Sequence, residues 1–299
     1  MDARVELRVG PAHDIEPKRE SSAMSQSAPT VADHYKRRAL GDVILAALQA
    51  AGKDIEHLTP DDLAPVDEFH TGQRRATMRL AELVAVTGSD RVLDVGCGIG
   101  GPSRYLAGTF GCDVVGLDLT PEFIELAAML AQRTRLAGKV TYSQGDALAL
   151  PFADASFDLV WSQNAAMNIA DRDRLYGEMR RVLKPGGRLA VQDVAAGPGG
   201  EPHYPTPWAG DRSISFLFTP PTTRAALERT GFRVVAWHDT TQEALEQQTA
   251  RVKTFDSGSL PPLGLHIVIG PEFPTVTRNM LRNLQEDRIR LFNAVLARG

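Results

Sequence analysis

A glycine-rich turn between a predicted strand and a predicted helix constrains this chain more than any other feature. Val92 to Ala107 read VLDVGCGIGGPSRYLA, with an apolar stretch ending at Asp94 and glycines at 96, 98, 100 and 101. A strand, a glycine turn and a helix suit a nucleotide, because glycines let a ligand approach the backbone and the helix N-terminus offers unpaired N–H groups. The pattern predicts an α/β fold with an adenosine-like ligand at this turn.

The acid that precedes the glycines discriminates between two kinds of ligand. Gly96, Gly98 and Gly101 satisfy G-x-G-x-x-G, the fingerprint of dinucleotide sites. The carboxylate of Asp94, two residues before the first glycine, would repel a pyrophosphate in a partly desolvated cleft. S-adenosylmethionine (SAM) fits better, since it carries a sulfonium and an α-ammonium beside its adenosine and has no phosphate. The sequence therefore favours SAM over a nicotinamide cofactor.

Two further acids follow predicted strands. The apolar run that starts at Asp113 ends at Asp118, whose carboxylate can accept from both ribose hydroxyls. The next run, from Val140, ends before Asp146, which can accept from the adenine amino group while Leu148 packs on the ring. Three acids at three strand ends indicate an adenosine site more strongly than the glycines do.

These motifs resemble the class I SAM-dependent methyltransferases. The superfamily pattern D-x-G-x-G-x-G matches Asp94 to Gly100, and the acids at 118 and 146 and the stretch R-V-L-K-P-G-G at 181–187 match as well. The resemblance implies an enzyme with a Rossmann-like seven-stranded sheet that methylates small molecules with SAM. The expected cofactor-binding residues in this part of the chain are Asp94, Gly96, Gly98, Gly100, Asp118, Leu119, Gly145, Asp146, Ala147, Leu148 and Gln163.

The segment before the glycine turn narrows the resemblance. Tyr35 and the turn from Phe69 to Gly72 resemble the lid of sarcosine and dimethylglycine N-methyltransferases and, more distantly, of phosphoethanolamine methyltransferases. The resemblance implies that Tyr35 faces the methyl donor and that Thr71 and Gly72 hold its methionine carboxylate. We expect a disordered tail over 1–33, where apolar periodicity is missing, and one methyltransferase domain over 34–299 with a helical lid at 34–85.

The residues that leave the fourth predicted strand, 163–169, should border both the methionine end of the cofactor and the substrate. Asn164 and Asn168 stand where phosphoethanolamine methyltransferases carry an Asp and a His that assist the reaction, and an amide is not a useful general base. The catalytic residue therefore stays open, with Tyr35, Asn164, Asn168 and His203 as candidates; the lid or the insertion could supply His70 or His203. A missing base favours an amine acceptor, which can lose its proton to solvent beforehand.

Two insertions are expected in the seven-stranded fold. The first, 195–221, follows the fifth predicted strand, and the second, 241–287, follows the sixth. The first is rich in Gly, Pro and aromatic residues. Tyr204 or Trp208 could hold a cationic methylammonium on a ring face, and Arg212 could clamp a carboxylate. Together with Asn164 and Asn168, these three are the expected substrate residues.

Composition excludes several classes of protein. The 299 residues are 43% hydrophobic with a formal charge of −4, and Lys and Arg are scattered, which argues against nucleic acid as a partner. The apolar runs are too short for a membrane span. Cys97 and Cys112 lack metal-ligand spacing, so no metal is expected, and Cys97 is interpreted as a small residue beside the cofactor. The start of the chain has no secretory pattern, which predicts a cytoplasmic protein; its oligomeric state, monomer or homodimer, is left open.

The leading hypothesis is N-methylation of a small amine or amino acid such as sarcosine or dimethylglycine. An alternative is a C-, O- or S-methyltransferase of a more apolar metabolite, suggested by Trp208, Phe216 and Phe218. Two alternatives of other classes are a nicotinamide oxidoreductase, which the glycine spacing allows, and a non-catalytic SAM-binding protein, which the asparagines at 164 and 168 allow.

Overall fold

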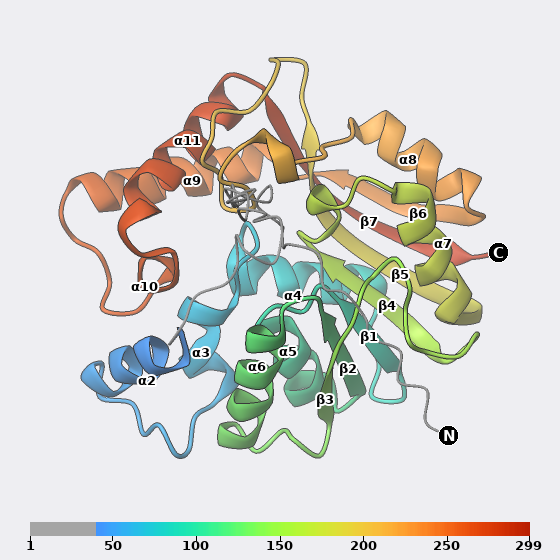
Figure 1. Ribbon diagram of the computed structural model, residues 1–299, viewed down its shortest axis with the longest axis horizontal. Coiled ribbons are helices and arrows are strands. Elements are labelled where there is room, and N and C mark those ends of the chain that lie inside the picture. Colours follow the sequence, from blue (N-terminus) through green and yellow to red (C-terminus); the bar gives the residue numbers. More distant parts are fainter. Residues whose placement is uncertain (1–39) are drawn as a thin grey trace, which may run out of the picture.

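The computed structural model describes residues 40–299 and contains one seven-stranded sheet (Figure 1). The strand order is β3-β2-β1-β4-β5-β7-β6, and β7 runs antiparallel to both of its neighbours. This confirms the expected Rossmann-like seven-stranded sheet. The strands are β1 (Arg91–Val95), β2 (Asp113–Asp118), β3 (Val140–Gln144), β4 (Phe157–Gln163), β5 (Leu183–Ala196), β6 (Phe232–Asp239) and β7 (Ile289–Arg298).

The helices fall into two groups. Those that alternate with the strands pack against the sheet, whereas α9, α10 and α11 lie beside one another on the side of the molecule that also holds α2 and α3 (Figure 1). The helices are α2 (Leu40–Ala50), α3 (Pro60–Asp67), α4 (Gln73–Val84), α5 (Gly101–Phe110), α6 (Pro121–Arg133), α7 (Arg172–Val182), α8 (Pro220–Arg229), α9 (Thr241–Asp256), α10 (Leu265–Ile269) and α11 (Phe273–Gln285).

The glycine turn lies between β1 and α5, as predicted. The backbone N–H of Gly96 donates to the carbonyl of Leu117 at 2.8 Å, which ties the turn to the end of β2. Gly96 has φ 77°, and a Cβ at this position would lie 2.5 Å from the Cβ of Ala165. Only glycine satisfies both constraints, so the close approach of the β1 and β4 loops depends on it.

Some element boundaries follow from local sequence signals, whereas others depend on contacts with distant parts of the chain. Thr59 and Asp62 form a capping box at the start of α3, where the sequence predicts a first turn. The apolar pattern predicts the fifth strand over 187–194, yet β5 is longer at both ends: Leu183 lies opposite Phe157 of β4, and the pairing with β7 continues to Ala196 opposite Ile289. The short helix α10, whose Leu265 and Val268 are buried, was not predicted.

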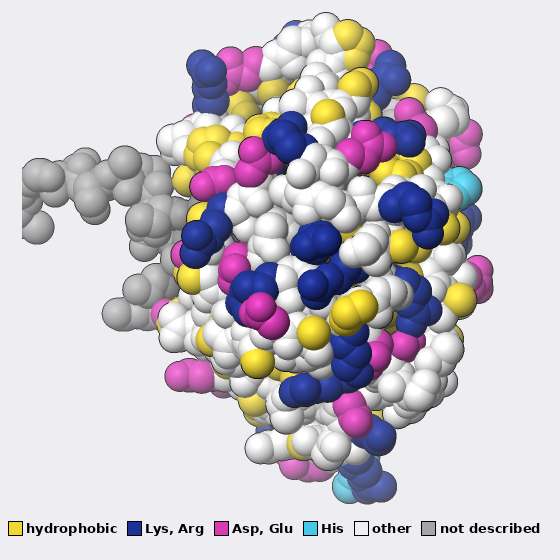
Figure 2. Space-filling model, turned by 90° about the vertical axis from the view of Figure 1, so that its right-hand side faces the viewer, with side chains coloured by type: hydrophobic (Ala, Val, Ile, Leu, Met, Phe, Trp, Pro, Cys, Tyr) yellow, Lys and Arg dark blue, Asp and Glu magenta, His cyan; other side chains and the backbone are white. Residues whose placement is uncertain are grey.

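The surface carries mixed charge. On the face in Figure 2, Lys and Arg side chains lie among acidic and neutral ones. Many are paired, such as Arg229 with Asp173 at 2.5 Å. Within residues 40–299, no helix combines the length and the apolar character that a membrane crossing requires.

Candidate active site

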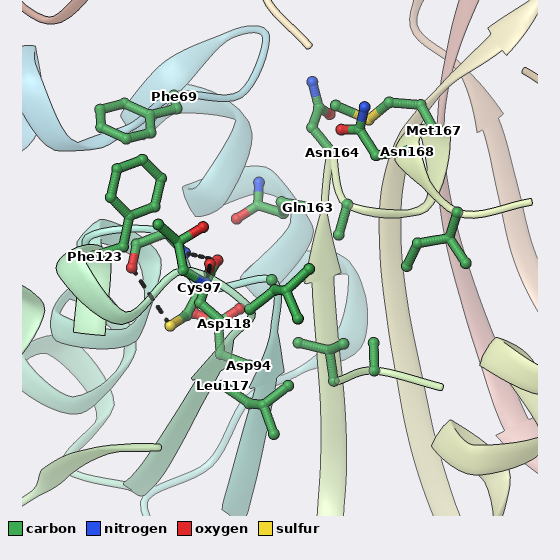
Figure 3. Close-up of a pocket in the computed structure, with 18 of the residues that line it drawn as sticks. Phe69, Asp94, Cys97, Leu117, Asp118, Phe123, Gln163, Asn164, Met167 and Asn168 are labelled. Atoms are coloured by element: carbon green, nitrogen blue, oxygen red, sulfur yellow. Dashed lines mark hydrogen bonds between the residues drawn. The ribbon is translucent and has the colours of Figure 1, made fainter. Parts of the chain in front are cut away.

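A cavity of about 450 Å³ opens where β1, β2, β3 and β4 end (Figure 3). Its floor is the glycine turn, and its walls are the segments that leave the other three strands. This is the edge of a parallel sheet where ligands bind, next to the point at which the strand order reverses between β1 and β4. Ten predicted cofactor residues line it: Asp94, Gly96, Gly98, Asp118, Leu119, Gly145, Asp146, Ala147, Leu148 and Gln163.

Gly100 is an exception among the predicted glycines. It has φ 82° at the N-terminus of α5, and a Cβ there would collide with the Tyr142 ring. Gly100 does not line the large cavity, so the structure assigns it a role in the turn rather than at the cavity surface.

Asp118 stabilises the glycine turn from the end of β2. One carboxylate oxygen accepts from the backbone N–H of Gly98 and the other from that of Thr120, both at 2.9 Å. Burial raises the pKa of Asp118, and these hydrogen bonds oppose the shift. Each oxygen keeps a lone pair, so the carboxylate can still accept from the hydroxyls of a ribose.

Asp94 is almost completely buried at the cavity floor. The Ser103 hydroxyl donates to its carboxylate at 2.6 Å. Burial raises the pKa of Asp94 to about 7; the hydrogen bond from Ser103 opposes this, and the charges of Asp118 and Glu68 add to it. A buried acid with this pKa gains most from a ligand that brings positive charge.

Two further oxygens at the cavity lack donors. Oδ1 of Asp67 and Oδ1 of Asn164 are both buried and have no hydrogen-bond partner among residues 40–299, and both residues line the cavity. Asn164 also adopts an uncommon positive φ of 51°. Unpaired buried acceptors beside a buried carboxylate fit a ligand with ammonium N–H groups and a sulfonium, as SAM has.

We expect SAM binding to release protons from Asp94. At pH 7 about half of the ligand-free molecules carry a proton on a group with pKa near 7, and a nearby cation favours the ionised form. Calorimetry at pH 7 in buffers of different ionisation enthalpy should therefore report a release of up to about half a proton.

The variant Asp94→Asn serves as the control, because it cannot ionise and should abolish the release. Equal binding enthalpies in all buffers for the unsubstituted protein would contradict the assignment. Between pH 3.8 and about 7 the folded state holds the proton and the unfolded state has lost it, so Asp94 lowers the free energy of unfolding as pH rises through this window.

The expected substrate residues of the first insertion lie elsewhere. Arg212 is exposed and pairs with Glu201 at 3.6 Å, and His203 pairs with Glu286 at 2.8 Å. Neither is among the residues that line the large cavity, so contacts of Arg212 and His203 with a substrate stay predictions.

The aromatic residues of this insertion are structural. Trp208 is buried and its indole N–H donates to the Ser215 hydroxyl at 3.0 Å. Tyr204 packs against the apolar cluster to which Trp208 belongs. Of this insertion, Pro207 lines the large cavity and the rings of Tyr204 and Trp208 do not, so their contacts with a methylammonium stay a prediction.

Asn168 lines the cavity, yet its amide is used within the protein. Its Nδ2 donates to the carbonyls of Trp208 and Ile214, both at 2.8 Å, and so fixes the insertion against the loop after β4. Gln163 is similarly committed, since its Nε2 donates to Gln192 at 2.7 Å.

Two of the three lid residues that the resemblance implied, Thr71 and Gly72, do not line the large cavity. Thr71 and Gly72 line two smaller cavities beside it, and the carbonyl of Thr71 accepts from Gln192 at 2.8 Å. Tyr35 lies outside the described residues. Contacts of these residues with the cofactor stay predictions.

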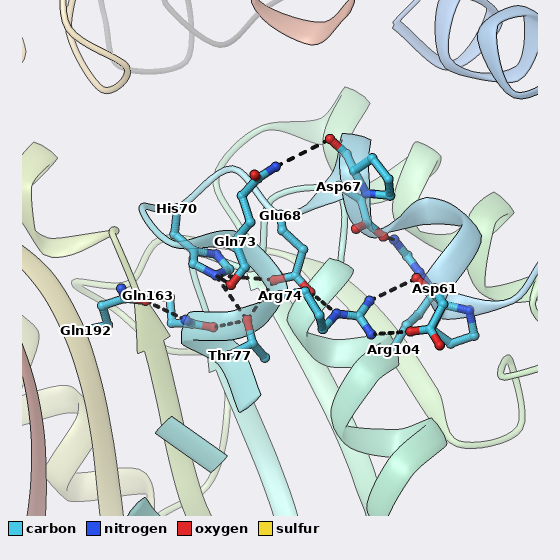
Figure 4. A network of polar contacts seen from close by, with 12 residues as sticks. Asp61, Asp67, Glu68, His70, Gln73, Arg74, Thr77, Arg104, Gln163 and Gln192 are labelled. Atoms are coloured by element: carbon cyan, nitrogen blue, oxygen red, sulfur yellow. Dashed lines mark hydrogen bonds and ion pairs between the residues drawn. The ribbon is translucent and has the colours of Figure 1, made fainter. Parts of the chain in front are cut away.

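A histidine on the cavity wall has a defined proton position (Figure 4). Nε2 of His70 lies 3.1 Å from the carbonyl of Gln73, 3.2 Å from Glu68 and 3.0 Å from the Thr77 hydroxyl. That hydroxyl donates to Glu68 at 2.7 Å, so Nε2 faces oxygen acceptors and carries the ring proton. Nδ1 is then a hydrogen-bond acceptor, and no residue of the described part of the chain donates to it.

Burial lowers the pKa of His70 to about 4, so the ring is neutral near pH 7. On the sequence alone, His70 is named only as a base that the lid could supply. Its chemical role depends on the Glu68 and Thr77 side chains, and spacing along the chain gives no sign that they meet its Nε2.

An apolar passage continues from the cavity. Phe69 and Phe123 lie with ring centroids 6.0 Å apart at the wall (Figure 3). Both also line a second cavity of about 70 Å³, whose other residues are mainly aliphatic: Leu40, Pro207, Leu265, Val268, Ile269 and Val276, with Thr206 and Glu272.

The comparisons with known proteins point to one superfamily. A family model described as a methyltransferase domain matches residues 93–191. O-methyltransferase resE of Aspergillus sclerotiorum is 31% identical over 184 residues, which are 60% of this chain and 68% of that protein. Methyltransferase GfsG of Streptomyces halstedii is 38% identical over 133 residues, 44% of this chain and 48% of that protein.

Other matches cover smaller shares of the relatives' lengths. Glycine/sarcosine/dimethylglycine N-methyltransferase of Actinopolyspora halophila is 31% identical over 175 residues, 58% of this chain and 31% of that protein. The match spans about half or less of the length of GfsG and of a tocopherol O-methyltransferase from Arabidopsis thaliana.

A solved structure supports the fold. The [4+2]-cyclase SpnF matches with a TM-score of 0.65 at 24% identity, over 91% of this chain and 97% of that one. The match to resE and the match to the methyltransferase-domain model indicate the same family, and the fold is consistent with it. This family membership argues against the nicotinamide oxidoreductase alternative. The chain belongs to the class I SAM-dependent methyltransferases.

Proposed function

We propose that this protein transfers a methyl group from SAM to a hydroxyl oxygen of a small, mainly apolar molecule. The observation that carries the proposal is His70, a neutral imidazole on the cavity wall whose Nδ1 accepts no hydrogen bond from residues 40–299 and can take up a proton. Bound SAM would supply a methyl group already activated by its sulfonium. The chain itself then has to hold the acceptor, exclude water and take up the hydroxyl proton.

The residues divide these tasks. Asp94, Asp118 and Asp146 would hold the cofactor along the three strand ends, and Phe69 and Phe123 lead to the apolar passage in which the body of an acceptor can lie. As the new C–O bond forms and the C–S bond breaks, the hydroxyl proton passes to Nδ1 of His70. Glu68 beside Nε2, at 3.2 Å, stabilises the resulting imidazolium.

The sequence favoured an amine acceptor because no base was evident at Asn164 and Asn168. His70 removes that reason, and an apolar passage suits an amino acid poorly. Relatives named as tocopherol O-methyltransferase and O-methyltransferase resE support an oxygen acceptor. N-methylation stays the second candidate, supported by the relative named glycine/sarcosine/dimethylglycine N-methyltransferase.

A panel of acceptors tests the proposal. The purified protein is incubated with methyl-labelled SAM and either phenols and hydroxylated apolar metabolites or glycine, sarcosine and dimethylglycine. We expect labelled methyl ethers from the first set and little product from the second. Turnover confined to the amines would favour the second candidate, and no turnover by protein that binds SAM would contradict both.

A further inference from the structure

Arg251, on α9, differs from the other arginines that are shielded from solvent. Arg104 and Arg172 are buried against Asp67 and Asp193, respectively. Arg251 is partly buried, and its only hydrogen bond among residues 40–299 goes from Nη2 to the side-chain oxygen of Gln73, at 2.8 Å. It takes part in no ion pair in this part of the chain, and burial lowers its pKa.

Such an arginine is costly unless a counter-ion arrives. A guanidinium removed from water loses hydration that one neutral amide restores only in part. Its remaining N–H groups are not sealed by protein, since the described residues contain no buried, unpartnered Arg251 nitrogen. If the only role of Arg251 were to donate to the Gln73 side chain, a neutral donor would serve, and the positive charge would have no function.

The cavity around Arg251 carries no acid. It has a volume of about 40 Å³, and its lining within the described chain has Arg251 as the one charged residue. The neighbours are neutral amides at Gln247 and Gln248 and apolar side chains of α10 and α11. This volume has room for a group of a few atoms, such as a carboxylate, and not for a whole acceptor.

The small cavity adjoins the large one. Phe69, His70 and Pro207 line both, so the two cavities meet at these three side chains. Gln73 links the two functions: its carbonyl accepts from Nε2 of His70, and its side-chain oxygen accepts from Arg251. An acceptor with its hydroxyl at His70 can thus place a second group beside Arg251.

We propose that Arg251 binds a carboxylate of the methyl acceptor, so that the substrate is a hydroxylated, mainly apolar acid. The inference rests on the proposed function for the position of the hydroxyl group. A guanidinium presents N–H donors in a plane that matches a carboxylate, and an apolar surrounding strengthens this contact.

The test compares acids with their methyl esters. Hydroxyaryl carboxylic acids, such as 4-hydroxycinnamic acid, and their methyl esters are titrated into protein saturated with S-adenosylhomocysteine. We expect the unsubstituted protein to bind an acid about 10- to 100-fold more tightly than its ester. Arg251→Met should remove the preference, and Arg251→Lys should keep part of it.

Arg79→Met is the matched control, because Arg79 lies at the neighbouring cavity and already pairs with Glu243. It should keep the preference. If Arg251 merely positioned Gln73, Arg251→Met would weaken acid and ester equally, and that result would overturn the inference. Equal affinity of the unsubstituted protein for acid and ester, or no binding of either, would also overturn it. If the protein prefers the acid over its ester through Arg251 but transfers no methyl group to it, the carboxylate site is supported and the proposed function is contradicted.

Discussion

Replacing His70 by glutamine is expected to lower kcat for a hydroxyl acceptor by about 10²- to 10⁴-fold, the usual contribution of a general base. Glutamine keeps an N–H donor near the position of Nε2, so the contacts with Gln73 and Glu68 can persist while the acceptor at Nδ1 is lost. SAM affinity and thermal stability should therefore stay close to those of the unsubstituted protein. Steady-state kinetics, calorimetry and thermal unfolding measure these three quantities.

The pH dependence separates a base from a positioning residue. His70, with a pKa of about 4, stays neutral down to that pH, so its protonation should not reduce activity between pH 8 and 5. In His70→Gln, the rate with a phenol should rise about tenfold per pH unit below the phenol's pKa, because solvent must first ionise it. His203→Gln is the control, since His203 pairs with Glu286 away from the cavity. A kcat for His70→Gln within threefold of the unsubstituted value would refute the assignment.

Replacing Arg104 by methionine should lower the free energy of unfolding by about 3–5 kcal/mol, because it leaves an uncompensated charge in the interior. Arg104 is fully buried in the first turns of α5 and donates to Asp67 at 2.8 Å (Figure 4). Its Nη1 donates to the Tyr142 hydroxyl at 3.3 Å. Burial raises the pKa of Asp67, and the charge of Arg104 opposes that shift. Urea unfolding of the two proteins measures the difference.

Two controls make the result specific. The double variant Arg104→Met with Asp67→Asn removes the stranded charge and should recover much of the loss. Arg229→Met breaks an ion pair with Asp173 in which both side chains are 58% exposed, and should cost less than about 1 kcal/mol. If Arg104→Met cost no more than Arg229→Met, the buried pair would not hold α3 against α5.

Much of the fold followed from local patterns. Strands that are buried on both faces read as apolar runs, and the capping box at Thr59 and the glycine after α8 at Gly231 mark helix ends. The extension of β5 and the helix α10 were missed, since they depend on pairing with β7 and on packing against α2 and α3.

The sequence by itself determined the cofactor half of the site, because Asp94, the glycines, Asp118 and Asp146 follow strand ends that a parallel sheet brings to one edge. Only the tertiary structure decided the acceptor half. Arg251 and Gln73 are 178 residues apart, and the proton position on His70 is set by Glu68 and Thr77 from two sides of a turn. Whether a histidine or an arginine reacts, pairs or merely packs depends on burial and on partners distant in the chain, and these exist only after folding.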